Sequence, residues 1–191
     1  MATIVLVVVL VVLALWVIGA YNKLVALKNQ VLNAWKQIDV QLRRRHDLIP
    51  NLVNTVKGAM AHERGTLEAV IAARTRAVGA TSVHEKAQAE GELTQALGRL
   101  FAVTEAYPQL RATENVSQLQ EELTSTENKI GFARQLYNDL ATQYNTAQSQ
   151  FPTNLVAGLA KASPAELWEI TDERERAVPA VDLSGGPGPT A

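Results

Sequence analysis

The chain has 191 residues, carries a formal net charge of −1 at pH 7 and contains no cysteine. A disulfide framework and a cysteine-based metal site are therefore excluded, and a nearly neutral chain gives little support to nucleic-acid binding. The length allows one membrane segment and one folded domain with its own core.

Residues 1–20 form an apolar run rich in Val and Leu, without a charged side chain. A helix of this length, at about 1.5 Å per residue, matches the roughly 30 Å hydrocarbon core of a bilayer. No basic residue precedes the run, and Ile18-Gly19-Ala20 is a poor cleavage site, which favours an uncleaved anchor over a signal peptide. We expect a transmembrane anchor over residues 1–20. Because Lys23, Lys28 and Lys36 follow it, the positive-inside bias places the N-terminus outside and the remainder in the cytoplasm.

Four segments after the anchor show the spacing of apolar residues that is typical of helices. We expect helices over residues 21–47, 50–78, 83–107 and 113–150. The last is the most regular, with apolar or aromatic side chains at every seventh position: Val116, Leu123, Ile130, Tyr137, Tyr144 and Phe151. A sustained seven-residue repeat favours the left-handed packing of helix bundles and coiled coils. The sequence therefore predicts an all-α fold, in which the anchor is followed by an antiparallel, up-and-down four-helix bundle over residues 21–151.

Pro50 lies between the first two expected helices. Its ring removes one backbone donor and disfavours helical geometry at Ile49, so it either kinks one long helix or separates two. The apolar stripe continues across Pro50 in phase, which favours a kink. An unbroken helix from Tyr21 to Val78 would, however, be about 87 Å long. We therefore place the chain reversal at Pro50.

The character of the sequence changes after Phe151. Residues 152–183 are expected to form a short helix and a docking segment, with Ser163 as N-cap, Pro164 at the first helical position and Glu166 at the third. Residues 184–191 are rich in Gly and Pro and are expected to be a disordered tail.

The charges are distributed unevenly along the chain. Residues 21–80 are basic and residues 81–191 are acidic, so the two halves are expected to pair within one bundle. The dense cluster Arg43-Arg44-Arg45 is interpreted as a solvated or internally paired face. Asp39 is expected to pair with Arg43 at i,i+4 spacing; a polar cluster that also includes His46 and Asp47 is the alternative.

No constellation in the sequence carries catalytic chemistry. Di-metal bundles use Glu-x-x-His, and none of His46, His62 and His84 has Glu three residues before it. His62-Glu63 and His84-Glu85 are adjacent pairs, whose side chains point to different sides of a helix. No phosphate-binding glycine loop or nucleophile elbow is present. We assign no catalytic, cofactor-binding or metal residues, expect no cofactor, and predict that the protein is not an enzyme.

Several motifs resemble the LemA family of bacterial membrane proteins. They occupy residues 21–25, 34–42, 44–53, 56–58, 62–63 and 66–70, then 137–139, 144–146, 151–154 and 176–182. The chain departs from the family pattern at Ala160-Lys161, where an aromatic residue is common, and at Leu183, where Phe is usual. The resemblance implies a single-pass inner-membrane protein with a cytoplasmic helical bundle, and it implies no established reaction.

The leading hypothesis is a membrane-anchored helical scaffold of the bacterial inner membrane that self-associates or binds other inner-membrane proteins. Its expected partners are the lipid bilayer and further copies of the chain, with no nucleic acid and no identified small-molecule substrate. The alternatives are a membrane signal-transducing subunit, which a short external N-terminus makes less favourable, and a cleaved, exported helical bundle.

Overall fold

The computed structural model describes residues 1–111, 113–159 and 162–169, and within them every regular element is a helix. The first helix, α1 (Ala2–Val56), is 55 residues long. It is followed by α2 (Arg64–Gly79), α3 (Val83–Thr104), α4 (Pro108–Arg111), α5 (Glu114–Ser149) and α6 (Thr153–Leu159). The expected all-α class with an N-terminal apolar helix is confirmed.

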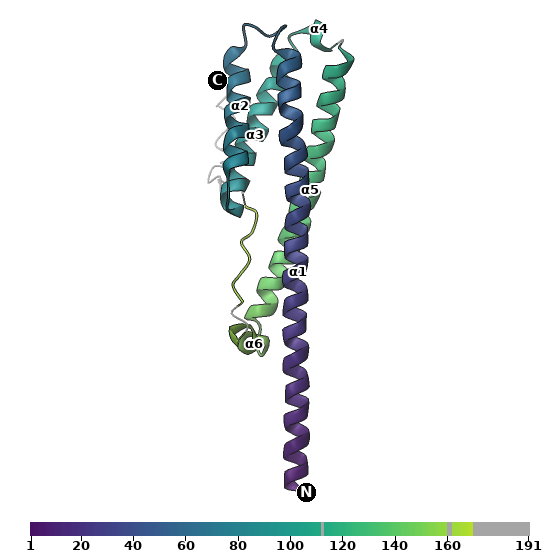
Figure 1. Cartoon of the computed structure of the whole chain (residues 1–191), viewed down its shortest axis with the longest axis vertical. Helices are drawn as coiled ribbons and strands as arrows, with labels where there is room; N and C mark the ends of the chain where they lie inside the picture. Colours follow the sequence, from purple (N-terminus) through teal and green to yellow (C-terminus); the bar gives the residue numbers. More distant parts are fainter. Residues whose placement is uncertain (112, 160–161, 170–191) are drawn as a thin grey trace, which may run out of the picture.

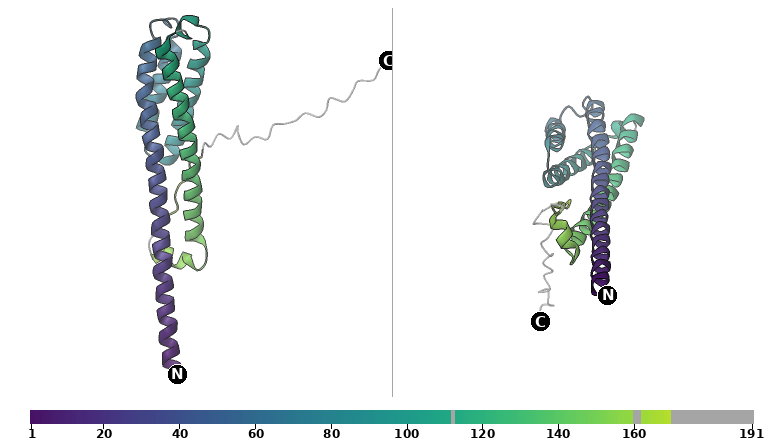
Figure 2. Two further views of the ribbon diagram at one scale, coloured as in Figure 1. Left: turned by 90° about the vertical axis from the view of Figure 1, so that its right-hand side faces the viewer. Right: turned by 60° about the horizontal axis from the view of Figure 1, so that its bottom comes forward.

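The two longest helices, α1 and α5, form an antiparallel pair that organises the molecule (Figure 1). The α2–α3 hairpin packs beside the half of this pair that lies far from the N-terminus, and α6 lies against the other half. The N-terminal part of α1 projects beyond α6, as the left view in Figure 2 shows. Four helices therefore run up and down in the distal half, whereas α1 and α5 continue together without α2 and α3 in the proximal half.

The buried side chains form two clusters along α1. The distal cluster joins α1, α2, α3 and the start of α5, and includes Ile49, Leu52, Val56, Val70, Leu93, Leu100 and Val116. The proximal cluster joins α1, α5, α6, the segment 162–169 and the start of α3, and includes Leu24, Ile38, Ala87, Ile130, Tyr137, Tyr144, Val156 and Trp168. The apolar stripe of α1 thus contributes to both clusters and ties the two halves together.

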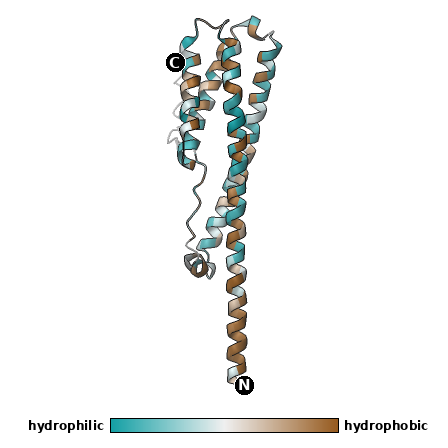
Figure 3. Ribbon diagram, in the orientation of Figure 1, coloured by the Kyte–Doolittle hydropathy of each residue, from teal (hydrophilic) through white to brown (hydrophobic). Residues whose placement is uncertain are grey.

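The first third of α1 is apolar on all sides and is not covered by the rest of the chain (Figure 3). Its large side chains from Ile4 to Leu15 are all exposed. A helix that is apolar all round is stable in water only when it is buried, and nothing in the described chain buries this one. By length and composition, α1 is the one helix among the described residues that could cross a membrane.

The reversal expected at Pro50 is wrong. Pro50 lies inside α1, which continues to Val56, and the chain turns back over residues 57–63. Ile49, Leu52, Val53 and Val56 carry the buried stripe of α1 past the proline. The in-phase stripe that favoured a continuous helix was therefore the stronger signal.

The helix predicted from 113 to 150 is confirmed as Glu114–Ser149. Val116, Leu123, Ile130, Tyr137 and Tyr144 are buried at successive heptad positions, but Phe151 is 79% exposed, because α5 ends before it. The helix start predicted at Ser163 is wrong: residues 162–169 have no helical structure. The expected tail, residues 184–191, and the motif at 176–182 lie outside the described residues.

Candidate functional site

The structure separates the polar residues that sequence analysis grouped on the first helix. Asp39 pairs with Arg43 at 2.8 Å, as expected, and also accepts a hydrogen bond from Lys86 of α3 at 3.2 Å. Asp47 is exposed, whereas His46 is buried and lies against Glu90 of α3. The expected pairing of basic and acidic halves is found in Arg76–Glu92 at 2.9 Å. The alternative cluster of Asp39, His46 and Asp47 does not form.

A buried ion cluster lies instead where α1, α3 and α5 meet. Arg45 is only 3% exposed, and its Nη1 lies 2.9 Å from Oε2 of Glu127 and 3.3 Å from Oε2 of Glu90. Its Nη2 donates to Oγ1 of Thr94 at 2.7 Å. The second carboxylate oxygen of Glu90 lies 2.7 Å from Nε2 of His46. One guanidinium group thus links three helices.

Burial dominates the electrostatics of this cluster. Desolvation lowers the pKa of Arg45, while the carboxylates of Glu127 and Glu90 oppose that shift. A cavity of about 200 Å³ borders Arg45 and Glu127. The guanidinium is already occupied by its carboxylate and hydroxyl partners, so the cluster holds helices together rather than presenting a free charge. Among the described residues no group of three or more His, Asp or Glu could hold a metal ion.

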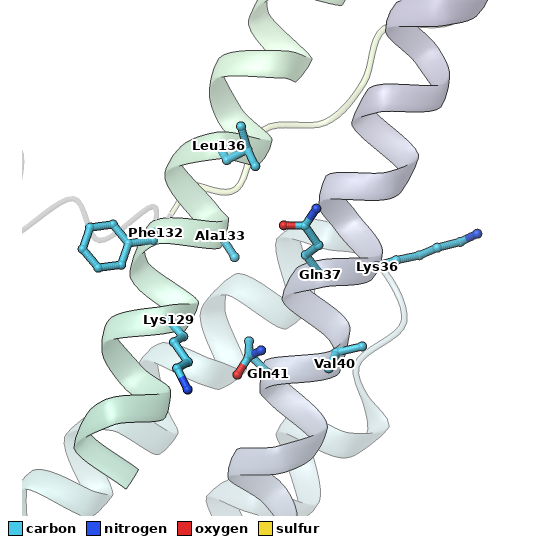
Figure 4. A pocket seen from close by; sticks show the side chains of 8 residues that line it. All are labelled: Lys36, Gln37, Val40, Gln41, Lys129, Phe132, Ala133 and Leu136. Atoms are coloured by element: carbon cyan, nitrogen blue, oxygen red, sulfur yellow. The ribbon is translucent and has the colours of Figure 1, made fainter. Parts of the chain in front are cut away.

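The second site is an open groove between α1 and α5, with a volume of about 450 Å³. Figure 4 shows the side chains that line it: Lys36, Gln37, Val40 and Gln41 from α1, and Lys129, Phe132, Ala133 and Leu136 from α5. Phe132 is 74% exposed and Val40 is 60% exposed, and both are large apolar side chains far from the N-terminal run. Gln41 Oε1 is buried here without a hydrogen-bond partner among the described residues. Exposed apolar side chains of this kind, flanked by polar ones, are typical of interaction surfaces.

The third feature is a backbone clasp, formed by Asn138 and Asn145 of α5 on residues 162–169. Asn145 donates to the carbonyl of Ala165 at 2.9 Å and accepts from its N–H at 2.8 Å. Asn138 makes the same pair of bonds with Trp168, at 3.0 and 2.8 Å. Asn138 and Asn145 are seven residues apart, which is about 10 Å along a helix. Ala165 and Trp168 are three residues apart, which is also about 10 Å along an extended chain. The two spacings agree, so each asparagine lies opposite one of the two backbone positions that it binds.

Aromatic packing fixes the end of the clasped segment. Trp168 is buried, with its ring centroid 5.9 Å from that of Trp35 and the guanidinium of Arg134 over its face at 6.0 Å. Tyr137 donates to the carbonyl of Glu166 at 2.7 Å, and burial raises the pKa of its hydroxyl. Figure 1 shows this segment running from α6 toward the near end of the α2–α3 hairpin. It therefore covers the face of the α1–α5 pair that the hairpin leaves open.

Sequence reasoning missed both the ion cluster and the clasp. The clasp has a signal in the sequence, because Tyr137-Asn138 and Tyr144-Asn145 repeat the same dipeptide seven residues apart. The ion cluster has none: Glu90 lies in a charged stretch that is typical of a solvated helix face. The other two histidines, His62 and His84, are exposed.

Comparison with known proteins shows the family of the chain. The sequence model of the LemA family matches residues 34–183. Protein LemA of Metamycoplasma hominis is 26% identical over 142 residues, which are 73% of this chain and 64% of the relative. Magnetosome protein MamQ 2 of Paramagnetospirillum magneticum is 32% identical over 81 residues, 42% of this chain and 30% of the relative. Magnetosome protein MamQ of Magnetospirillum gryphiswaldense is 32% identical over 69 residues, 36% of this chain and 25% of the relative. The matched regions thus span less than two thirds of these relatives. The LemA family model covers most of the length of this chain, and the chain therefore belongs to the LemA family.

Proposed function

We propose that this protein is a membrane-anchored helical scaffold that self-associates at the bacterial inner membrane and has no catalysis of its own. The observation that carries the proposal is the double role of α1. One continuous helix is first an uncovered apolar rod and then a wall of the exposed groove at Val40 and Phe132. A protein built this way holds an interaction surface at a fixed place above a membrane.

The groove is the surface we propose for self-association. Copies anchored in one membrane stand parallel, so their grooves lie at the same height. Burying Val40 and Phe132 between copies would remove exposed apolar area from water, at about 25 cal/mol per Å². The flanking amino groups of Lys36 and Lys129 remain able to reach solvent at the rim, because long lysine side chains extend past an apolar contact.

Native mass measurement of the full chain in mild detergent tests self-association. The unaltered protein is expected to give oligomers, and Phe132→Glu is expected to shift them toward monomer, because it places a charge in the proposed contact. Val78→Glu is the matched control, since Val78 is also exposed, at 55%, but lies on α2. A strictly monomeric unaltered protein would overturn the proposal, as would an equal response of the two variants.

Thiol labelling tests the orientation. The basic residues Lys23, Lys28 and Lys36 support a cytoplasmic bundle. Because the chain has no cysteine, Ser184→Cys introduces a single thiol. A membrane-impermeant reagent is expected to leave this thiol unlabelled in intact cells and to label it after lysis. Labelling in intact cells would place the bundle outside.

A further inference from the structure

The turn between α5 and α6 lies beside the end of the apolar run of α1. Val156 and Ala157 of α6 are buried in the same cluster as Leu24 of α1. Val17 and Ala20 are partly covered and pack against that cluster. Figure 2 shows the turn at the end of the bundle nearest the projecting part of α1. The described chain therefore reaches back along α1 to within the last residues of the uncharged run.

The position of this contact along α1 sets the height of the turn relative to a bilayer. The uncharged run ends before Lys23, and an apolar helix of about 20 residues fills the hydrocarbon core. Val17 lies three residues before residue 20, which is about 5 Å deeper along the axis of α1. A group packed against Val17 and Ala20 therefore lies at the boundary between acyl chains and headgroups. Trp16 and Tyr21, at 40% and 48% exposed, mark the same level with the aromatic side chains that favour it.

The chemistry of the turn suits that boundary. Residues 150–160 contain no charged side chain. Phe151 is 79% exposed and Leu155 is 62% exposed, although the heptad positions before Phe151 are buried. The first charged residue after the turn, Lys161, lies outside the described residues. An uncharged turn with two large exposed apolar side chains is unfavourable in water and favourable at the edge of a bilayer.

We propose that the α5–α6 turn is a second membrane contact, in which Phe151 and Leu155 enter the boundary of the leaflet from which α1 emerges. This inference rests on the proposed membrane-spanning role of α1. The occupant is lipid rather than a second copy, because the patch is continuous with the apolar rod and shares its height. Two contacts, one spanning and one interfacial, would set the tilt of the bundle on the membrane.

Spin labels on single cysteines test this contact in the intact chain. The cysteine-free sequence allows four variants: Phe151→Cys, Leu155→Cys, Val78→Cys and Val9→Cys. Each is labelled with a nitroxide and reconstituted in vesicles of phosphatidylethanolamine and phosphatidylglycerol. Collision with oxygen, which concentrates in lipid, is compared with collision with a water-soluble nickel chelate. Circular dichroism verifies that every labelled variant keeps its helix content.

Val78 is the control, because it is also a large exposed apolar side chain, at 55%, but lies on α2, away from both the membrane end and the proposed self-association groove. We expect labels at 151 and 155 to collide several-fold less with the nickel chelate than the label at 78, and to gain oxygen collisions. The label at 9 is expected to be deepest.

The possible outcomes separate the two proposals. If the labels at 151 and 155 are as open to nickel as the label at 78, while the label at 9 lies in lipid, the second contact alone is overturned. A label at 9 that is open to nickel would overturn the membrane-spanning role. Protection of 151 and 155 from both reagents would mean that protein covers them, and would also overturn the lipid contact.

Discussion

Nε of Arg74 on α2 donates a hydrogen bond to the main-chain carbonyl of His46 on α1, at 2.7 Å. This carbonyl is the one that residue 50 would satisfy in an ordinary helix, and Pro50 has no N–H to give. Arg74 therefore replaces the missing helical donor from a neighbouring helix. This bond compensates for the N–H that Pro50 lacks, and it also holds α2 against α1.

Replacement of Arg74 is expected to depend on Pro50. In the native background Arg74→Met leaves the carbonyl of His46 without its donor and should lower the free energy of unfolding by about 1–3 kcal/mol. In a Pro50→Ala background residue 50 supplies its own N–H, and the same replacement should cost clearly less. Urea unfolding of the four proteins in micelles, followed by circular dichroism, measures this coupling. Equal costs in both backgrounds would show that the bond does not compensate for the proline.

The ion cluster is expected to be sensitive to removal of one partner. Glu90→Leu leaves Arg45 buried with less compensation, so the free energy of unfolding should fall by about 3–5 kcal/mol. Arg45→Met with Glu90→Leu should cost less than the sum of the two single changes. The control is Arg76→Met, which breaks an exposed ion pair with Glu92 at 2.9 Å and should cost no more than about 1 kcal/mol. A similar loss in the control and in Glu90→Leu would contradict the role of burial.

Loss of the asparagine clasp is expected to release residues 162–169 locally. Asn138→Ala removes the hydrogen-bond partners of both the N–H and the carbonyl of Trp168. An unsatisfied buried amide costs about 1–3 kcal/mol. The equilibrium constant for local opening of this segment should therefore rise on the order of tenfold to a hundredfold. Hydrogen exchange of peptides covering Ala165 and Trp168 should accelerate accordingly, while exchange in α2 and α3 stays unchanged. Asn128→Ala, an exposed asparagine on the same helix, is the control. Unchanged exchange in Asn138→Ala would show that packing of Trp168 alone holds the segment.

The capping box of α3 is expected to weaken in acid. Glu85 accepts hydrogen bonds from the N–H groups of Thr81 and Ser82, at 3.0 and 3.2 Å, and these bonds lower its pKa from the ordinary value of 4.5. A lowered folded-state pKa gives stability that is present above pH 4.5 and lost as pH falls through the folded-state value.

Stability measured against pH checks the role of Glu85. The difference in unfolding free energy between the native protein and Glu85→Gln should be constant near neutral pH and shrink in acid. Ser82→Ala removes the other half of the box without removing an ionisable group, and its cost of about 1 kcal/mol should vary less with pH, because the Ser82 side chain is the smallest contributor to the lowered pKa of Glu85. A pH-independent Glu85→Gln difference would contradict the assignment.

Periodic features of the sequence predicted periodic features of the structure. The heptads of α5 and the apolar run of α1 each repeat the need to remove apolar side chains from water along a single helix. Both patterns can therefore be recognised without knowing which helix or lipid covers them. Arg45 could not be placed in this way. It directly follows two exposed arginines, Arg43 and Arg44, and its burial depends on Glu90 and Glu127, which come from other helices.

Rules based on neighbouring residues failed where a group distant in the sequence supplied a hydrogen bond that stabilises another local structure. The proline rule predicted a break at Pro50, which Arg74, 24 residues further along, prevents. The capping pattern at Ser163 and Glu166 predicted a helix, but α5 supplies side-chain partners for the extended backbone. The candidate interaction groove was likewise hidden, because it depends on the alignment of α1 with α5.

In the proposed self-association, the fixed height of the groove changes how strongly two copies need to bind each other. Lys36 to Gln41 lie about 24–32 Å beyond residue 20 along α1. Every copy in one membrane presents the same surface in the same thin layer, so encounters take place in two dimensions. Confinement of this kind raises the effective concentration as a tether does, and contacts with millimolar dissociation constants become populated. An association too weak to detect for the helical body free in solution could therefore still gather these proteins into patches on a bilayer.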